Sequence, residues 1–480
     1  MSPPRLRRAA AVLCAVQVLV GVAALGFVDD GPGATTRVAT AAPAPVSTAT
    51  TAGAPTTTAP SEAPTPVATA ARTTRPPAPP RPTTTARPLT FAERIARALA
   101  PVPASCLLAD GPTGAVVSLG VDRPLAAASV QKLLVGAAAL SALGPDFRFR
   151  TLAVSAAPPV NGTVDRVWLV GAGDPVLATP AFAGQLSTRP RYGSLPLTPL
   201  DELAARVAGA GVHTITNGVT PDDSRYSRER TLSVWTKAQE PEKNVGALGA
   251  LVVDGGWKPG SKPWVTDPGD PSVTAANAFT HLLSAHDVGA PAANGQGGAP
   301  TTAFTVAAID SAPLANIVAA MLRTSDNFTA EELVRELGAR FGGAGTHDAG
   351  LAVIRDQLTK LGVPLDGVTL VDGSGMSFSD RATCRAVATA LALADQATFH
   401  GLADGLAVPG APGTLSKRYV GTPLAARLRA KTGSITHVQA LAGTLAAGVP
   451  LRFVLLQNAV ASATAASVER NVLDVLLTAS

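Results

Sequence analysis

Ser129 and Lys132 are spaced so that one side chain could activate the other. They lie near the start of residues 126–140, where apolar residues recur every three to four positions, so we predict a buried helix with both residues in its first turn. Side chains at this spacing lie on the same helical face. A serine hydroxyl is a weak nucleophile, and a partly desolvated lysine amine can accept its proton. Because a serine cap followed by a surface lysine is also common, the pair alone does not establish catalysis.

A second polar group, Ser325-Asp326-Asn327, lies between two segments that we predict to be helical, residues 314–322 and 329–339. Thr329 and Glu332 have the spacing of a capping box at the start of the second helix. We therefore expect residues 325–327 on a short turn that is anchored at both ends. Ser, Asp and Asn are also ordinary turn residues, so this signal is weak by itself.

A third group, Lys431-Thr432-Gly433-Ser434, lies on a predicted strand near the C-terminus. Lysine supplies positive charge, the two hydroxyls donate hydrogen bonds, and glycine lets another backbone approach closely. This combination suits an extended peptide that carries a carboxylate and lies along a strand edge. The same residues are also plausible at an ordinary strand end.

The elements expected around these groups come from both ends of the folded region. Residues 91–99 are predicted to be a helix, and the turn residues 110–114 between two short apolar runs predict a hairpin just before Ser129. The C-terminal elements are predicted strands at 430–435, 440–445 and 451–456 and a helix at about 464–477. We therefore expect one sheet built from both ends, with the middle of the chain as an insertion.

The middle region has predicted elements of its own. They are strand-like segments at 147–154 and 164–170 and helices at 200–210 and 274–285. His281 and His286 do not share a helical face, and no Glu completes a metal-binding motif, so we expect no metal there.

The first 88 residues differ in composition from the rest. A basic start precedes residues 9–28, which carry no charge and are long enough to cross a bilayer core of about 30 Å. We predict a retained membrane anchor within residues 1–30, with a cleaved signal peptide as the alternative. Residues 31–88 are rich in alanine, threonine and proline, which predicts a disordered linker.

The net charge of +5 is carried by this N-terminal region, and the remaining residues are neutral overall. A neutral folded region has no electrostatic footprint for nucleic acid. Cys14 lies in the apolar run, which leaves Cys106 and Cys384 in the folded part. If that part is exported, these two could form a disulfide, and two buried free thiols are the alternative.

The three polar groups occur in the order Ser-x-x-Lys, Ser-Asp-Asn, Lys-Thr-Gly. Over residues 89–480 the chain resembles the low-molecular-mass class C penicillin-binding proteins, the D-alanyl-D-alanine carboxypeptidases and endopeptidases of bacterial peptidoglycan. Further segments that resemble this family are 144–151, 171–177, 222–226, 372–377 and 427–434.

The resemblance implies an α+β fold. A serine β-lactamase/transpeptidase-like domain, with an antiparallel sheet flanked by helices, would comprise residues 89–147 and 311–480. Residues 148–310 would form a large inserted domain.

Residue roles also follow from the resemblance. Ser129 would attack the carbonyl between two D-alanines, and Lys132 would accept its proton. Ser325 would relay protons to the leaving amine, and Asn327 would hold the substrate's amide. The backbone N–H groups of Ser129 and Ser434 would form the oxyanion hole.

The third group would bind the end of the substrate. Thr432 and Ser434 side chains would hold the terminal carboxylate on the strand that contains Gly433. Lys431 would keep a positive charge near Lys132 and so, with desolvation, favour a neutral amine there.

The implied activity is serine D-Ala-D-Ala carboxypeptidase, possibly also endopeptidase, on peptidoglycan stem peptides in the extracytoplasmic cell envelope. β-Lactam antibiotics would acylate the same serine, and no metal or organic cofactor is needed. Three alternatives are a β-lactamase, a catalytically silent wall-binding protein that keeps the fold, and an unrelated Ser-His-Asp hydrolase. The large insertion argues against the first, the full set of motif residues against the second, and the uninformative histidine contexts against the third.

Overall fold

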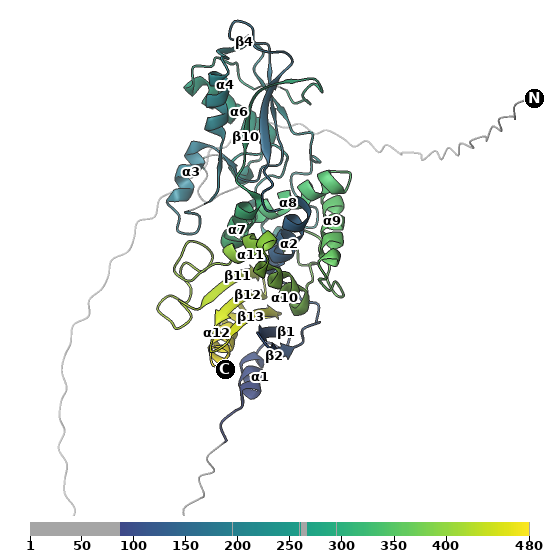
Figure 1. Ribbon diagram of the computed structural model, residues 1–480, viewed down its shortest axis with the longest axis vertical. Coiled ribbons are helices and arrows are strands. Elements are labelled where there is room, and N and C mark those ends of the chain that lie inside the picture. The colour runs from purple at the N-terminus through teal and green to yellow at the C-terminus, as the bar shows by residue number, and fades with distance from the viewer. Residues whose placement is uncertain (1–86, 194, 259, 261–265, 294, 480) are drawn as a thin grey trace, which may run out of the picture. The chain divides into compact units, whose positions relative to one another are not determined.

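A computed structural model describes residues 87–193, 195–258, 260, 266–293 and 295–479 (Figure 1). The anchor predicted within residues 1–30, and nearly all of the linker predicted for 31–88, lie outside these residues. Among the residues that the structure describes, no helix is both long and apolar enough to span a bilayer.

The main sheet has five strands in the order β11-β12-β13-β1-β2, and all neighbours pair antiparallel. Its strands are β1 (Ser105–Gly111), β2 (Gly114–Leu119), β11 (Leu428–Ile435), β12 (Val438–Ala446) and β13 (Pro450–Asn458). The central pairing joins β1 to β13, with Leu108 opposite Val454. The prediction of one sheet built from both ends of the chain is therefore confirmed.

Alternate residues of β1 point into two different cores, as the two-residue period of a strand requires. Leu107 packs with Ile95 of helix α1 (Phe91–Leu99) and Val468 of α12 (Ser462–Leu476). Leu108 packs with Leu134 on the opposite face. The sheet is thus covered by helices on both sides.

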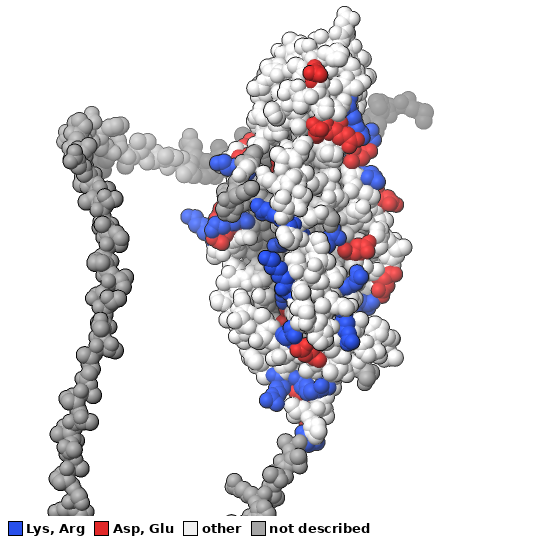
Figure 2. All heavy atoms as spheres, turned by 90° about the vertical axis from the view of Figure 1, so that its left-hand side faces the viewer, with Lys and Arg blue, Asp and Glu red and all other residues white. Residues whose placement is uncertain are grey.

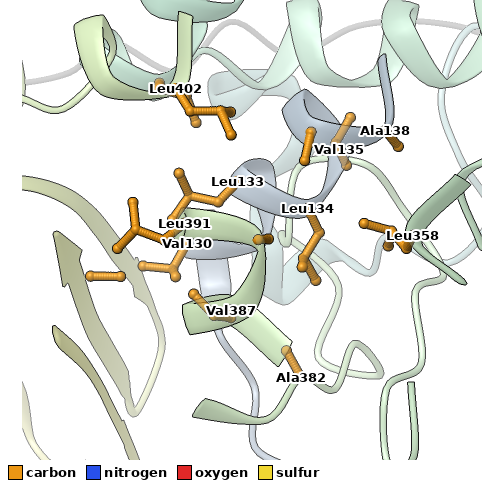
Figure 3. Packing of buried hydrophobic residues seen from close by; sticks show 14 of the residues in the cluster. Val130, Leu133, Leu134, Val135, Ala138, Leu358, Ala382, Val387, Leu391 and Leu402 are labelled. Atoms are coloured by element: carbon orange, nitrogen blue, oxygen red, sulfur yellow. The ribbon is translucent and has the colours of Figure 1, made fainter. Parts of the chain in front are cut away.

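The central helix is α2 (Lys132–Leu143), in which every residue from Lys132 to Leu140 is buried. Figure 3 shows Leu133, Leu134 and Val135 of α2 among apolar side chains of the surrounding helices. Those helices are α7 (Leu314–Thr324), α8 (Asn327–Phe341), α9 (His347–Lys360), α10 (Cys384–Ala392) and α11 (His400–Asp404). Ser129 lies in a 3₁₀ turn, Ala128–Gln131, before the α-helix rather than in its first turn.

A second sheet, of order β10-β3-β5-β9, is formed entirely by residues between 150 and 310. Its strands are β3 (Arg150–Ser155), β5 (Val167–Val170), β9 (Val219–Asp222) and β10 (Phe304–Asp310), with α4 (Leu200–Gly209) and α6 (Pro271–Ala285) packed against it. The remaining elements are α3 (Pro180–Ser187), α5 (Pro241–Asn244) and short strands β4 (Thr163–Val164), β6 (Leu177–Ala178), β7 (Thr198–Pro199) and β8 (Thr214–Ile215).

The start of α8 differs from the sequence prediction. Asp326 is the N-cap, and its carboxylate accepts a hydrogen bond from the Thr329 backbone N–H at 2.7 Å. The capping box predicted for Thr329 and Glu332 is therefore wrong, and the helix begins at Asn327. An aspartate cap competes well with threonine because its side-chain oxygen reaches the first free N–H groups of the helix.

Cys106 of β1 and Cys384, the first residue of α10, form a disulfide, with Cα atoms 6.1 Å apart. Of the two alternatives that the sequence left open, a disulfide or two buried free thiols, the structure shows the disulfide. The bond fastens α10 to the sheet.

On the face shown in Figure 2, basic and acidic side chains both occur along the described part of the chain.

Candidate active site

The amine of Lys132 lies at the centre of the site. The side chain has no solvent exposure, and its Nζ lies 2.9 Å from Ser129 Oγ, 2.8 Å from Asn327 Oδ1 and 2.6 Å from the Ser374 carbonyl oxygen. The 3₁₀ turn before α2 directs Ser129 toward this amine. The structure thus brings together the first two sequence groups, which are far apart in the chain.

Burial lowers the pKa of Lys132 from 10.5 to about 8. Glu331, Asp372 and Asp326 oppose this shift, and Arg191 adds to it. A larger fraction of Lys132 is therefore neutral near physiological pH than for an exposed lysine.

Lys431 of β11 lies beside the turn that carries Ser325. Its Nζ donates to Ser325 Oγ at 2.9 Å and to the Thr432 carbonyl at 2.6 Å. Burial, followed by the nearby charges of Lys132 and Arg191, lowers the pKa of Lys431 well below 10.5. Whether Lys431 keeps a positive charge near Lys132, as the family resemblance implies, therefore stays a prediction, because burial acts against that charge. Two buried amines this close to each other disfavour each other's charged form.

Ser325 and Asn327 are positioned by the junction of two helices. Ser325 ends α7 with φ of 59° and ψ of 43°, in the left-handed region that non-glycine residues rarely adopt. Asn327 begins α8, and its amide nitrogen donates to the Asn244 carbonyl at 2.8 Å while its oxygen faces Lys132. Asn327 is therefore held beside the Lys132 amine, and Ser325 beside the Lys431 amine.

Gly433 lets β11 lie against the turn that carries Ser129. A Cβ atom at this position would be 2.6 Å from the Ala127 carbonyl oxygen and 3.1 Å from the Val130 nitrogen. Thr432 on the same strand is half-buried, and Ser434 is exposed. Of the predicted site residues outside β11, Ser129 and Asn327 contact Lys132, and Ser325 contacts Lys431 of that strand.

The loop of residues 372–377, which the sequence analysis noted only as resembling the family, contacts Lys132 through the Ser374 carbonyl. Glu331, buried in α8, accepts hydrogen bonds from the backbone N–H groups of Gly373 and Ser374, both at 2.8 Å, and its other contact is His347 at 3.0 Å. The Ser374 carbonyl is thereby held against the lysine amine. The pKa of Glu331 is lowered, because the hydrogen bonds to its carboxylate outweigh the effect of burial.

Asp372 fixes the other end of this loop. Its carboxylate accepts from the backbone N–H groups of Gly375 and Ser377, at 2.6 and 2.7 Å, and from the Trp235 indole at 2.9 Å. Gly375 has φ of 75°, and a Cβ there would lie 2.1 Å from the Ala128 carbonyl oxygen. Glycine is required because no side chain fits between this loop and the Ser129 turn.

A cavity of about 180 Å³ opens over Ser129. Its lining comprises Ser129, Asn327, Ser434, Ile435, Thr436, Met376 and Phe378 together with Ala238, Gln239, Glu240 and Asn244. The last four come from the middle of the chain and were not anticipated as site residues, because no sequence motif marks them. The Gln239 amide donates to the Met376 carbonyl at 2.9 Å, which ties that segment to the site.

The histidines considered for a metal site are His281 and His286. His286 lies 2.9 Å from Asp201 Oδ1. Among the described residues, no group of three or more His, Cys, Asp or Glu side chains is arranged to hold a metal ion.

Comparison with known proteins shows the same family over most of the chain. The model of the D-Ala-D-Ala carboxypeptidase 3 (S13) family matches residues 113–261 and 260–480. Carboxypeptidase DacB of Mycolicibacterium smegmatis is 31% identical over 361 residues, covering 73% of this chain and 75% of that protein. The D-alanyl-D-alanine carboxypeptidase of Actinomadura sp. is 28% identical over 393 residues, covering 66% of this chain and 70% of that protein.

The fold is also that of a solved structure. Penicillin binding protein 4 of Haemophilus influenzae superimposes with a TM-score of 0.68 at 20% identity, covering 80% of this chain and 99% of that one. The predicted α+β, transpeptidase-like fold is confirmed. The chain belongs to the D-Ala-D-Ala carboxypeptidase 3 (S13) family and is a serine-type D-alanyl-D-alanine carboxypeptidase.

Proposed function

We propose that Ser129 is the nucleophile of this carboxypeptidase and that Lys132 is its base. The contacts of the Lys132 amine carry the proposal. A neutral amine has two N–H bonds and one lone pair. The Asn327 and Ser374 oxygens can only accept, so they take the two N–H bonds, and the lone pair is left for the Ser129 hydroxyl at 2.9 Å.

Ser325 would carry the proton to the leaving group. Its hydroxyl accepts a hydrogen bond from Lys431 Nζ at 2.9 Å. As the bond from Ser129 Oγ to the carbonyl carbon forms, the peptide C–N bond breaks, and the departing D-alanine amine takes up a proton through Ser325. Water then hydrolyses the ester and restores the serine.

The substrate would lie along β11. This strand is at the end of the sheet order, and its outer edge is bridged to Ala407 at Ala430, so the extended peptide would lie along the part that begins at Thr432. Thr432 and Ser434 would bind the terminal carboxylate, with the N–H groups of Ser129 and Ser434 as the oxyanion hole. A carboxylate bound there raises the pKa of Lys431, so we infer that this lysine becomes charged with the substrate in place.

β-Lactams would acylate the same serine. When the β-lactam ring opens, the nitrogen released from the carbonyl stays attached to the acyl group. No leaving group departs, and the acyl-enzyme is slow to hydrolyse. Penicillin binding protein 4 of Haemophilus influenzae was solved with a β-lactam, which is a finding on that protein. A β-lactamase would instead release the opened ring quickly, and a silent wall-binding protein would form no adduct.

The decisive experiment is covalent labelling by a fluorescent penicillin, together with release of D-alanine from a stem pentapeptide. Ser129→Ala should lose both signals, and Ser118→Ala, which changes an exposed serine of β2, should keep both. A labelled Ser129→Ala protein would refute the assignment. Rapid loss of label from the wild type would favour the β-lactamase alternative, and cleavage of cross-linked muropeptides would establish an additional endopeptidase activity.

The enzyme belongs to the cell envelope, outside the cytoplasm, where peptidoglycan lies. The Cys106–Cys384 disulfide fits an oxidising compartment. We infer that residues 1–30 anchor it to the membrane and that residues 148–310 form an inserted domain on the catalytic unit 89–147 and 311–480. Deletion of residues 1–30 behind a cleavable signal peptide should move the enzyme from the membrane fraction to the soluble one, and recovery of both proteins in the soluble fraction would argue for secretion.

A further inference from the structure

Arg191 reaches the active-site turn from the middle region of the chain. It lies on the loop between α3 and β7, and its Nε donates to the Thr324 carbonyl at 2.7 Å. A second guanidinium nitrogen contacts the same oxygen. Thr324 is the last residue of α7, directly before Ser325.

The end of α7 needs such a partner. The last carbonyl groups of a helix receive no hydrogen bond from an N–H group of the same helix, and a cation near the C-terminus is favourable. Ser325 is also held in a left-handed conformation that serine seldom adopts, so the surroundings must stabilise it. Arg191 fastens the peptide group directly before this strained residue.

Tyr192, the residue after Arg191, lies near the start of α8. Tyr192 lines a small cavity with Asp326, Phe328 and Thr329. Burial raises the pKa of its hydroxyl. Arg191 is thus part of a packed contact between the loop and the turn that contains Ser325 and Asn327.

The charge of Arg191 also acts on both active-site amines. It is a named cause of the lowered pKa of Lys132 and of Lys431. The carboxylates that act on Lys132 from the other elements are Glu331 and Asp326 of the α8 region and Asp372 of the loop, and all three raise its pKa, while Lys431 of β11 is a neighbouring cation. Arg191 offsets these carboxylates.

We propose that Arg191 is a positioning residue of this carboxypeptidase: its guanidinium, bonded to the Thr324 carbonyl, fixes the turn that carries Ser325. The loop that holds Arg191 thereby becomes part of the active site. The inference rests on the proposed roles of Ser129, Lys132 and Ser325.

Two substitutions separate the hydrogen bonds that Arg191 donates from the charge that it carries. Arg191→Gln keeps a donor for the Thr324 carbonyl but removes the charge, so the pKa of Lys132 should rise. Because acylation needs neutral Lys132, the rising limb of the acylation rate against pH should move to higher pH by about half a unit. Arg191→Lys keeps the charge but loses the planar fork, so the limb should stay in place while the maximal rate falls about tenfold.

The test measures the rate of labelling by a fluorescent penicillin from pH 6 to pH 10, with thermal melting of each variant. Arg150→Gln, which changes an exposed arginine of β3, serves as the control and should match the wild type. The proposal is overturned if both Arg191 variants keep the wild-type labelling rate and pH profile. It is also overturned if the rising part of the Arg191→Gln pH profile stays at the wild-type pH. Labelling of Ser129→Ala would instead overturn the assignment of the nucleophile.

Discussion

Replacement of Glu331 by glutamine should damage the site in a distinctive way. The carboxylate accepts hydrogen bonds from the backbone N–H groups of Gly373 and Ser374 and contacts His347. Glutamine has one acceptor oxygen, so its NH₂ group would face a backbone donor. Hydrogen bonds to charged groups contribute about 1.5 to 3 kcal/mol each, so we expect Glu331→Gln to lower the free energy of unfolding by about 2 to 4 kcal/mol.

The pH profile gives the sharper readout. Glu331 is the largest of the charges that raise the pKa of Lys132. Without that charge the pKa falls below about 8, so the rising limb of acylation should move to lower pH. The maximal rate should fall at the same time, because the Ser374 carbonyl is no longer held against the amine.

The control is Glu336→Gln, on the same helix. Glu336 is equally buried and is paired with Arg225 and Arg340, but it does not contact the loop. It should lose stability without moving the limb. The assay is the rate of penicillin acylation against pH, with urea unfolding for stability. An unmoved limb, or one at higher pH, in Glu331→Gln would refute the electrostatic reasoning.

Three further predictions concern other parts of the site and scaffold. Gly433→Ala should reduce acylation by at least about a hundredfold, because the added methyl overlaps the Ala127 carbonyl and separates β11 from the Ser129 turn; a near-normal labelling rate would contradict this. Cys384→Ser should lower the free energy of unfolding by about 2 to 4 kcal/mol in urea titrations, and a reductant should destabilise the wild type but not the variant. Asp326→Ala should lose the cap on the Thr329 N–H and about 1 kcal/mol of stability by thermal melting, with an unchanged melting temperature as the contrary result.

Much of the catalytic unit could be predicted from local sequence patterns. Short apolar runs predicted β1 and the three C-terminal strands, and the hairpin followed from the turn residues 110–114. The spacing of Ser129 and Lys132 indicated that they meet, and their 2.9 Å contact confirms it. These features depend on residues close together in the chain or on a recognised set of motifs.

The rest could not be predicted because it depends on contacts between distant segments. Nothing near Glu331 or Arg191 in the sequence marks either as part of the site. The strand predicted for residues 147–154 begins only at Arg150, because the Phe149 N–H bonds to the Ser311 hydroxyl at 3.0 Å instead of joining a ladder. The burial that lowers the pKa of Lys431 could not be read from the Lys-Thr-Gly motif either.

The pairing of β1 with β13 has a consequence for how the chain acquires its structure. β1 is among the first folded residues to be made, yet its partner across the centre of the sheet lies near the C-terminus. Until β13 is available, one edge of the N-terminal hairpin remains open, and contacts of such long sequence separation form slowly. A chain that stops before residue 450 would lack this partner strand, so we expect truncated products to be cleared by proteolysis instead of persisting as partly active enzymes.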